Sequence, residues 1–181
     1  MGRLEESEKA YRDGLDLLPD QPDLYYNLGR ALYEQGRWDD AEESFRKTLS
    51  LNHAYPLAHW NLSHVMLLHG RFREGWLEYE WRWHCPGFTT QIPKFEQPRW
   101  DGKDISGETL LVYAEQGFGD TMQFVRYLPG LSARGCRVIF LCQPELARLL
   151  RDISGIEEIV TEWTALPEFD LHTPLMSLPM L

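Results

Sequence analysis

Hydrophobic positions divide the chain into two patterns. In the first 85 residues, apolar side chains recur every three or four positions, as at Leu24, Leu28 and Leu32. This spacing places them on one face of an α-helix. Beyond residue 108, short apolar runs such as Leu110–Ala114 alternate with helical patterns. The chain is therefore predicted to form a helical array followed by a partial Rossmann-like, parallel α/β domain.

Four columns of similar residues recur at intervals of 34 positions in the helical half. They are Gly2, Gly36 and Gly70; Leu4, Trp38 and Phe72; Ser7, Ala41 and Gly75; and Tyr11, Phe45 and Tyr79. We expect each glycine of the first column to end a helix in a tight turn, and the large apolar residue to pack back on the helix pair. The small residue would let two helices approach closely, and the aromatic residue would fill the groove to the next helix.

The 34-residue pattern resembles the tetratricopeptide repeat. This frame gives a half repeat over residues 1–21, repeats over 22–55 and 56–85, a joint over 86–107, and the α/β domain over 108–181. The repeat pattern begins with a second helix, and the α/β pattern stops before a full sheet could close. We therefore expect a fragment, or an array that leans on the following domain, because stacked repeats need neighbours for stability.

A repeat array of this kind would present a concave groove to a protein or peptide. The residues expected to face the groove are Tyr26, Asn27, Arg30, Tyr33, Trp60 and Asn61. Asn27 and Asn61 resemble the asparagine ladder of repeat-bearing protein O-GlcNAc transferases, in which amides grip a peptide backbone. An amide suits that task because it carries an acceptor and two donors. The alternative is that both asparagines are consensus surface residues.

The end of the second repeat is rich in aromatic residues. We expect Trp76, Trp81 and Trp83 to seal the last helix in a packed joint, and the alternative is a surface on which a sugar or peptide stacks. Prolines and glycines between residues 85 and 102 predict loop structure there. The histidines at 59, 64 and 69 step by five, which does not suit a metal site on a helix, so no metal is expected.

The central stretch predicts a buried strand, a glycine turn and a helix. Gly117 and Gly119 would let the backbone turn sharply and leave room for a ligand. Asp120 could cap the next helix. Further elements are expected as a helix over 121–134 that Pro129 kinks or shortens, a strand over 137–142, a helix over 144–150, and short strands over 156–160 and 169–172.

The glycine turn does not match a dinucleotide site. Met122 stands where a third glycine is needed, and Gln143 stands near the place of the ribose-binding acid. No cofactor is therefore expected. Asp120 would lie beyond the carboxyl end of the first strand, where such sheets place their ligands, and it could act there as a general base. The alternative is a helix cap, whose position would lower its basicity.

The segment Glu115-Gln-Gly-Phe-Gly-Asp120 followed by Pro129 is similar to the N-terminal motif of heptosyltransferase-like enzymes, glycosyltransferase family nine. Residues 98–102, 143–147 and 169–179 resemble bacterial proteins that join tetratricopeptide repeats to such a domain. The resemblance implies a GT-B fold and an inverting transfer from a nucleotide sugar. Asp120 would be the catalytic base, and Gln116, Gly117 and Gly119 would lie at the substrate.

The same resemblance limits what this chain is expected to do alone. In that family a second Rossmann-like domain holds most of the donor, and the chain has no counterpart of it. We therefore expect nucleotide-sugar binding only with that C-terminal domain, and no activity from residues 1–181 by themselves. The alternative function is a non-catalytic tetratricopeptide-repeat scaffold for protein–protein interaction.

Charge and cysteine usage narrow the partners and the compartment. The net charge is −10 and neither half is basic, which argues against nucleic acid or an anionic membrane surface as a partner. The three cysteines form no C-x-x-C pair, which favours a reducing cytoplasm. No apolar run approaches the roughly 20 residues of a membrane span.

Overall fold

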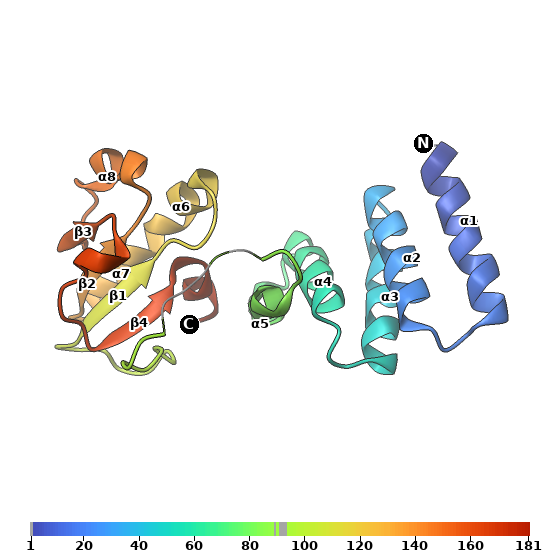
Figure 1. Cartoon of the computed structure of the whole chain (residues 1–181), viewed down its shortest axis with the longest axis horizontal. Coiled ribbons are helices and arrows are strands. Elements are labelled where there is room, and N and C mark those ends of the chain that lie inside the picture. Colours follow the sequence, from blue (N-terminus) through green and yellow to red (C-terminus); the bar gives the residue numbers. More distant parts are fainter. Residues whose placement is uncertain (1, 89, 91–93) are drawn as a thin grey trace. The chain divides into compact units, whose positions relative to one another are not determined.

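The computed structural model describes residues 2–88, 90 and 94–181 and consists of two compact units, Met1–Phe88 and Thr89–Leu181. The first is helical and the second is a parallel α/β unit (Figure 1), which confirms the predicted fold class. The joint expected over 86–107 includes residues 89 and 91–93, which lie outside the described residues.

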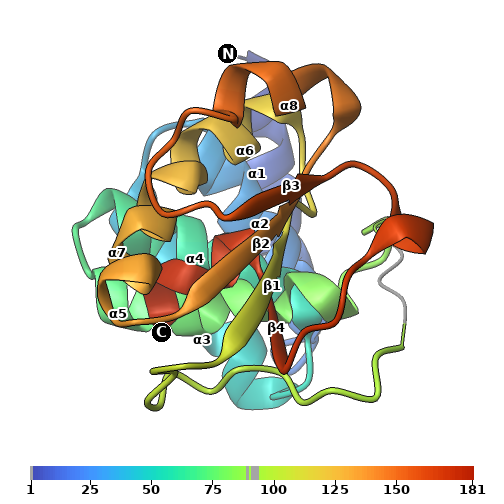
Figure 2. The same ribbon diagram turned by 90° about the vertical axis from the view of Figure 1, so that its left-hand side faces the viewer.

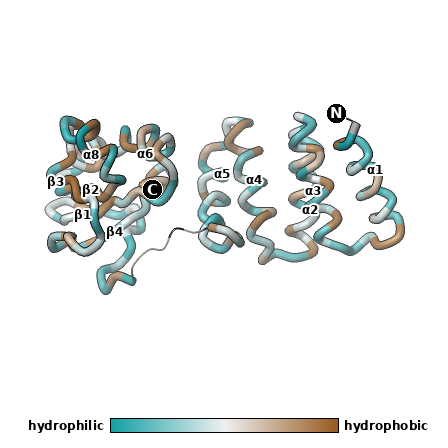
Figure 3. The backbone as a smooth tube through the Cα atoms, turned by 45° about the horizontal axis from the view of Figure 1, so that its top comes forward, coloured by the Kyte–Doolittle hydropathy of each residue, from teal (hydrophilic) through white to brown (hydrophobic). Residues whose placement is uncertain are grey.

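The first unit is a row of antiparallel helices whose starts repeat. Its helices are α1 (Gly2–Leu17), α2 (Pro22–Glu34), α3 (Trp38–Leu51), α4 (Pro56–Leu68) and α5 (Phe72–Tyr79), followed by the 3₁₀ turn η1 (Glu80–His84). Both α2 and α4 begin with proline, whose missing N–H would have no helical partner at that place. Hydrophobic and hydrophilic segments alternate along the helices in Figure 3, as amphipathic packing requires.

Three of the four repeated columns have the roles that the spacing predicts. Gly36 and Gly70 end α2 and α4 with φ of 76° and 73°, values that only glycine adopts without strain. A Cβ at Gly75 would meet the Leu67 side chain at 2.8 Å, so the small column does allow close approach. Phe45 is fully buried and Tyr79 is 8% exposed, so the aromatic column belongs to the core.

The prediction for the large apolar column is wrong in two of its members. Trp38 is 41% exposed and Phe72 is 63% exposed. Each is the first residue of its helix, α3 or α5, so its side chain lies at the helix end and outside the buried face. The Trp38 ring makes an edge contact with His69, at 6.5 Å between centroids.

The ion pairs of the array repeat with the same period as its core. Arg37 donates to Glu8 at 2.8 Å, and Arg71 donates to Glu42 at 2.9 Å. Each residue of the second pair follows its counterpart in the first pair by 34 positions. The pairs join α1 to the start of α3, and α3 to the start of α5. Polar contacts as well as packing therefore fix the register between successive repeats.

The second unit is built on a four-stranded parallel sheet. Its strands are β1 (Thr109–Tyr113), β2 (Arg137–Leu141), β3 (Glu158–Val160) and β4 (Leu171–Pro174), in the order β3-β2-β1-β4. The chain moves outward from β1 to β3 and then returns to the other side of β1 as β4. This reversal places a topological switch point at β1, and ligands of open α/β sheets bind outside the carboxyl ends of the strands there.

Helices and an aromatic layer cover the sheet. Between β1 and β2 the chain forms α6 (Phe118–Phe124), the 3₁₀ turn η2 (Val125–Tyr127) and α7 (Leu128–Ala133), and Pro129 lies in the first turn of α7, so the predicted interruption is present. The helix α8 (Pro144–Leu150) follows β2. Figure 2 shows α6 and α7 on one side of the sheet and the turn η3 (Trp163–Ala165) on the other. That other face buries Leu111, Tyr113, Ile139, Leu141 and Val160 beneath Phe95, Trp163, Leu166 and Phe169.

Candidate functional site

The glycine turn lies directly after β1, at the carboxyl edge of the sheet. Gly117 is the N-cap of α6 and has φ −67° and ψ 173°, and Gly119 is not among the glycines with positive φ. The chain does turn here from β1 into α6, but neither glycine uses the left-handed conformation that only glycine adopts easily. Any residue type could adopt the Gly117 backbone, so the fold does not explain these glycines by their dihedral angles.

Asp120 lies in the first turn of α6 and does not occupy the cap position. The helix begins at Phe118, three residues earlier than a cap at Asp120 requires, and its N-cap is Gly117. Asp120 is half-buried, and its Oδ2 would lie 3.6 Å from a Cβ built on Gly117. The carboxylate therefore turns back toward Gly117 and the strand end, and it makes no cap that would explain it.

The space beside the two glycines is open. A Cβ on Gly119 would meet no atom within 4 Å, and a Cβ on Gly117 would meet only the Asp120 carboxylate. Packing therefore does not require glycine at either position. Open backbone beside a half-buried carboxylate is an arrangement that allows a ligand to approach closely.

Gln116 contributes its backbone to a small network at this edge. Gln143, the N-cap of α8, donates from Nε2 to the Gln116 carbonyl at 2.8 Å. The Thr121 hydroxyl lies 3.0 Å from Gln143 Oε1. These contacts fix the glycine turn to the start of α8, a link between distant parts of the sequence that the strand and helix pattern did not reveal.

Glu115 is a residue to which the sequence prediction gave no role beyond its place in the motif. It follows β1, it is 4% exposed, and one carboxylate oxygen accepts the backbone N–H of Met176 at 3.4 Å. Met176 belongs to the 3₁₀ turn η4 (Leu175–Met180) that follows β4. Glu115 thus ties together the carboxyl ends of β1 and β4 at the switch point. An acid directly after an apolar strand is the sequence signal that could have drawn attention to it.

Two residues expected in the peptide groove are instead part of the array's internal structure. Tyr26 is 7% exposed, and its ring lies 5.0 Å from Tyr55 and 6.2 Å from Phe45. Asn61 donates from Nδ2 to the Tyr26 hydroxyl at 3.3 Å and to the Leu57 carbonyl at 2.8 Å. The Asn61 amide therefore joins α4 to α2, and both of these donations are made inside the array.

The other asparagine differs from Asn61 in its surroundings. Asn27 and Arg30, both on α2, line a hollow of about 170 Å³ with Leu4, Ser7 and Tyr11 of α1. Arg30 is exposed, and its guanidinium lies 5.9 Å from the Tyr26 ring centroid. The two members of the expected ladder are thus not equivalent, because Asn27 lines a hollow whereas Asn61 bonds within the array.

The remaining groove candidates are partly covered. Tyr33 packs against the array core. Trp60 is half-buried, its ring lies 5.2 Å from His64, and its indole nitrogen is buried without a hydrogen-bond partner among the described residues. Both rings therefore offer limited surface to a peptide.

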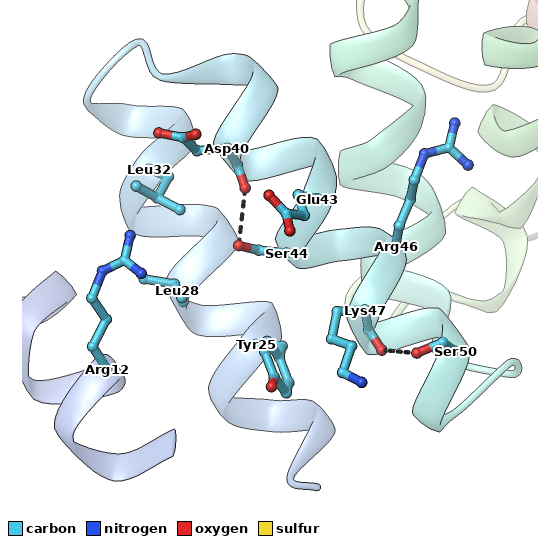
Figure 4. A pocket seen from close by; sticks show the side chains of 10 residues that line it. All are labelled: Arg12, Tyr25, Leu28, Leu32, Asp40, Glu43, Ser44, Arg46, Lys47 and Ser50. Atoms are coloured by element: carbon cyan, nitrogen blue, oxygen red, sulfur yellow. Dashed lines mark hydrogen bonds between the residues drawn. The ribbon is translucent and has the colours of Figure 1, made fainter. Parts of the chain in front are cut away.

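A larger hollow of the repeat unit involves other residues (Figure 4). It has a volume of about 620 Å³ and lies where α1, α2 and α3 meet. Arg12 comes from α1 and Tyr25, Leu28 and Leu32 come from α2, while α3 supplies Asp40, Glu43, Ser44, Arg46, Lys47 and Ser50. None of the predicted groove residues lines this hollow.

The aromatic residues at the end of the array pack on one another within the first unit. The Trp81 indole stacks on His59, with centroids 3.9 Å apart and planes 3° apart. Trp76 makes an edge contact with Tyr79 at 5.5 Å, and Trp83 makes one with Phe88 at 4.9 Å. All three tryptophans are half-buried, and the packed joint with the following domain stays a prediction.

Histidines and cysteines do not form a reactive cluster in the described part of the chain. There, no group of three or more His, Cys, Asp and Glu side chains is placed to hold a metal ion. Burial raises the pKa of the Cys85 and Cys142 thiols to about 11. Both therefore stay protonated near neutral pH and are poor nucleophiles.

Comparisons with known proteins support the repeat half directly. Residues 1–72 match the family described as Tetratricopeptide repeat. A segment of 64 residues, 34% of the chain, is 41% identical to protein FlbA of Caulobacter vibrioides, and the match covers 10% of FlbA. The helical half is therefore a tetratricopeptide-like array.

The solved structures similar to the chain include a mutant O-GlcNAc transferase of Thermobaculum terrenum, with a TM-score of 0.41 and 15% sequence identity. The similarity covers 91% of this chain and 39% of that one. This chain thus spans well under half of the length of either protein. No helix among its described residues is long and apolar enough to cross a membrane.

Proposed function

We propose that the chain couples a protein- or peptide-binding repeat array to part of a glycosyltransferase, in which Asp120 is the general base for the acceptor hydroxyl. The donor would be a nucleotide sugar, held mainly by a second domain, as in the family nine transferases that the sequence resembles. The cytoplasm is the compartment that suits the three free thiols.

The observation that carries this proposal is the open turn around Asp120. Neither the dihedral angles nor the packing requires Gly117 and Gly119, and Asp120 makes no helix cap. The turn lies beyond β1, at the switch point of the sheet. A half-buried carboxylate beside open backbone at this place is where an acceptor hydroxyl could be deprotonated.

The decisive substitution is Asp120→Asn in the whole protein that contains this chain. Glu145→Gln is the matched control, because Glu145 is the acid in the first turn of α8, the helix after the neighbouring strand. We expect transfer to fall about 10²- to 10⁴-fold in the Asp120→Asn variant, the usual contribution of a positioned base, and to stay unchanged in the control. Release of nucleoside diphosphate from a panel of nucleotide sugars measures both variants.

A non-catalytic scaffold is the second candidate, and one observation favours it. The hollow between α1, α2 and α3, about 620 Å³, is several times larger than the hollow at Asn27 and belongs wholly to the array. If wild type, Asp120→Asn and Glu145→Gln all transfer at the same measurable rate, the base assignment is wrong. Equal binding of protein partners by both variants would then support the scaffold.

A further inference from the structure

We propose that the crevice at the carboxyl ends of β1, β2 and β3 binds a single neutral sugar ring. This inference rests on the proposed function for its place in a transfer reaction. The binding itself follows from the chemistry of the crevice and can be measured without turnover.

The crevice lies beside the glycine turn and has a volume of about 180 Å³. Ala114 follows β1, Cys142 and Gln143 follow β2, and Thr161 and Trp163 follow β3, so these lining residues come from three strand ends. This is the edge at which parallel sheets place their ligands. Gln143 also contacts Gln116, which joins the crevice to the turn that holds Asp120.

Gln143 presents an amide that is held in one orientation. Its Oε1 accepts from Thr121 at 3.0 Å, and its Nε2 donates to the Gln116 carbonyl at 2.8 Å. A side-chain amide has two donor hydrogens and two acceptor lone pairs. One donor hydrogen and one acceptor lone pair of this lining amide therefore have no partner among the described residues. Hydroxyl groups of a sugar ring can accept from that donor and donate to that acceptor.

Trp163 supplies an apolar wall whose position is fixed by packing. Its indole ring lies 5.5 Å from Tyr113 and 6.0 Å from Phe95, measured between centroids. An aromatic wall combined with a few oriented polar groups is the usual composition of a small-molecule site. The C–H face of a sugar ring is apolar and can pack on the indole while the hydroxyls meet Gln143.

Size and charge exclude a nucleotide from the crevice. Its lining includes no lysine or arginine among the residues that the structure describes. The Cys142 thiol, with its pKa raised to about 11 by burial, is neutral as well. Pockets for drug-sized ligands usually measure about 300–1,000 Å³, so this crevice suits one ring and not a nucleoside diphosphate.

Titration of residues 1–181, isotope-labelled for NMR, tests the proposal directly. The probes are glucose, N-acetylglucosamine and mannose, with UMP as the anionic comparison. We expect saturable shifts of the Gln143, Thr161 and Trp163 signals with at least one sugar and none with UMP. Absence of saturable shifts with every sugar, or saturation by UMP alone, would overturn the assignment.

Two substitutions locate the binding. Gln143→Leu removes the amide and is expected to weaken the sugar about tenfold, whereas Gln123→Leu on the exposed surface of α6 serves as the control and leaves affinity unchanged. Gln143 also supports the turn, so a second variant that leaves the turn intact is needed.

Thr161→Val removes an exposed hydroxyl of the lining, and sugar affinity is expected to fall about two- to tenfold in this variant. Unchanged affinity in Thr161→Val and in a folded Gln143→Leu contradicts the proposal.

The two proposals fail in different ways. In one case the chain binds no sugar, but Asp120→Asn still lowers transfer. That result would refute sugar binding in the crevice and keep Asp120 as the base. In the opposite case, Gln143→Leu weakens sugar binding but Asp120→Asn leaves transfer unchanged. That result would refute the base and keep the crevice as a saccharide site.

Discussion

The two units of the chain use polar residues in opposite ways. In the repeat unit, Glu8–Arg37 and Glu42–Arg71 recur with the 34-residue period and join one helix to the next. In the α/β unit, the polar residues Glu115, Thr121 and Gln143 gather at one edge of the sheet. Polar contacts that follow the repeat are explained by the architecture, whereas polar residues concentrated at one edge call for a functional explanation.

Glycines show the same contrast. Cβ atoms built on Gly29 and Gly75 would meet Phe45 at 2.7 Å and Leu67 at 2.8 Å, so packing demands glycine at both places. Gly119 has open space around it, and Gly117 faces only Asp120. At the carboxyl edge of the sheet, where ligands bind, a glycine that the fold does not need is better evidence for a ligand site than one that fills a contact.

The largest effect on stability is expected for Gly29→Ala. The added methyl group would overlap the buried Phe45 ring, and such overpacking of a core costs about 1–3 kcal/mol. The higher helix preference of alanine offsets roughly 0.5–1 kcal/mol of this cost. We expect the free energy of unfolding of the array to fall by about 1–2 kcal/mol, measured by denaturant titration.

A graded series controls for helix propensity. At Gly14 the new Cβ would lie 3.3 Å from the end of the Leu24 side chain, which can move, so Gly14→Ala should be close to neutral. If Gly29→Ala were as stable as Gly14→Ala, close packing would not explain the glycine at position 29. The contrast between packed glycines in the array and open ones in the α/β unit would then weaken.

The sequence predicted the elements that depend on local chemistry or on the period. Gly36 and Gly70 lie in tight turns, Phe45 and Tyr79 are core residues, and Pro129 interrupts the helix after β1. Each of these follows from a backbone preference of one residue type or from spacing in one helix.

Features that depend on three-dimensional position were not predicted. A period fixes the register of Trp38 but not its exposure, because that depends on the place of the residue at the helix end. The contacts of Gln143 with Gln116 and Thr121 join segments more than 20 positions apart. Asp120 was misplaced as a cap because the helix begins three residues before the pattern of apolar positions indicates, and element boundaries are the least reliable part of a sequence prediction.

A smaller effect, with a distinct pH dependence, is expected for Glu42→Gln. The hydrogen bond from Arg71 lowers the pKa of Glu42 more than burial raises it. A carboxylate with a lowered pKa in the folded state stabilises that state above its unfolded pKa of about 4.3, and this contribution is lost as the pH falls further. We expect Glu42→Gln to cost about 1 kcal/mol at pH 7, and less as the pH drops below about 4.

Thermal unfolding of wild type and variant between about pH 3 and 7 measures this dependence. Glu43→Gln is the matched control, because the neighbouring Glu43 is exposed and forms no ion pair among the described residues. A difference between wild type and Glu42→Gln that stayed constant across this range would show that charge does not carry the contribution.

The smallest effect on stability, and the most informative for the site, is expected for Gly119→Ala. The new methyl group meets no atom within 4 Å, and alanine is preferred to glycine in a helix, so stability should rise by about 0.5–1 kcal/mol. Gly130→Ala in α7 is the control, since its Cβ would also be free. Transfer by the whole protein should fall only in the Gly119→Ala variant, because only there would a methyl group stand where a ligand approaches. Equal transfer by the two variants would mean that the open space at Gly119 is unused.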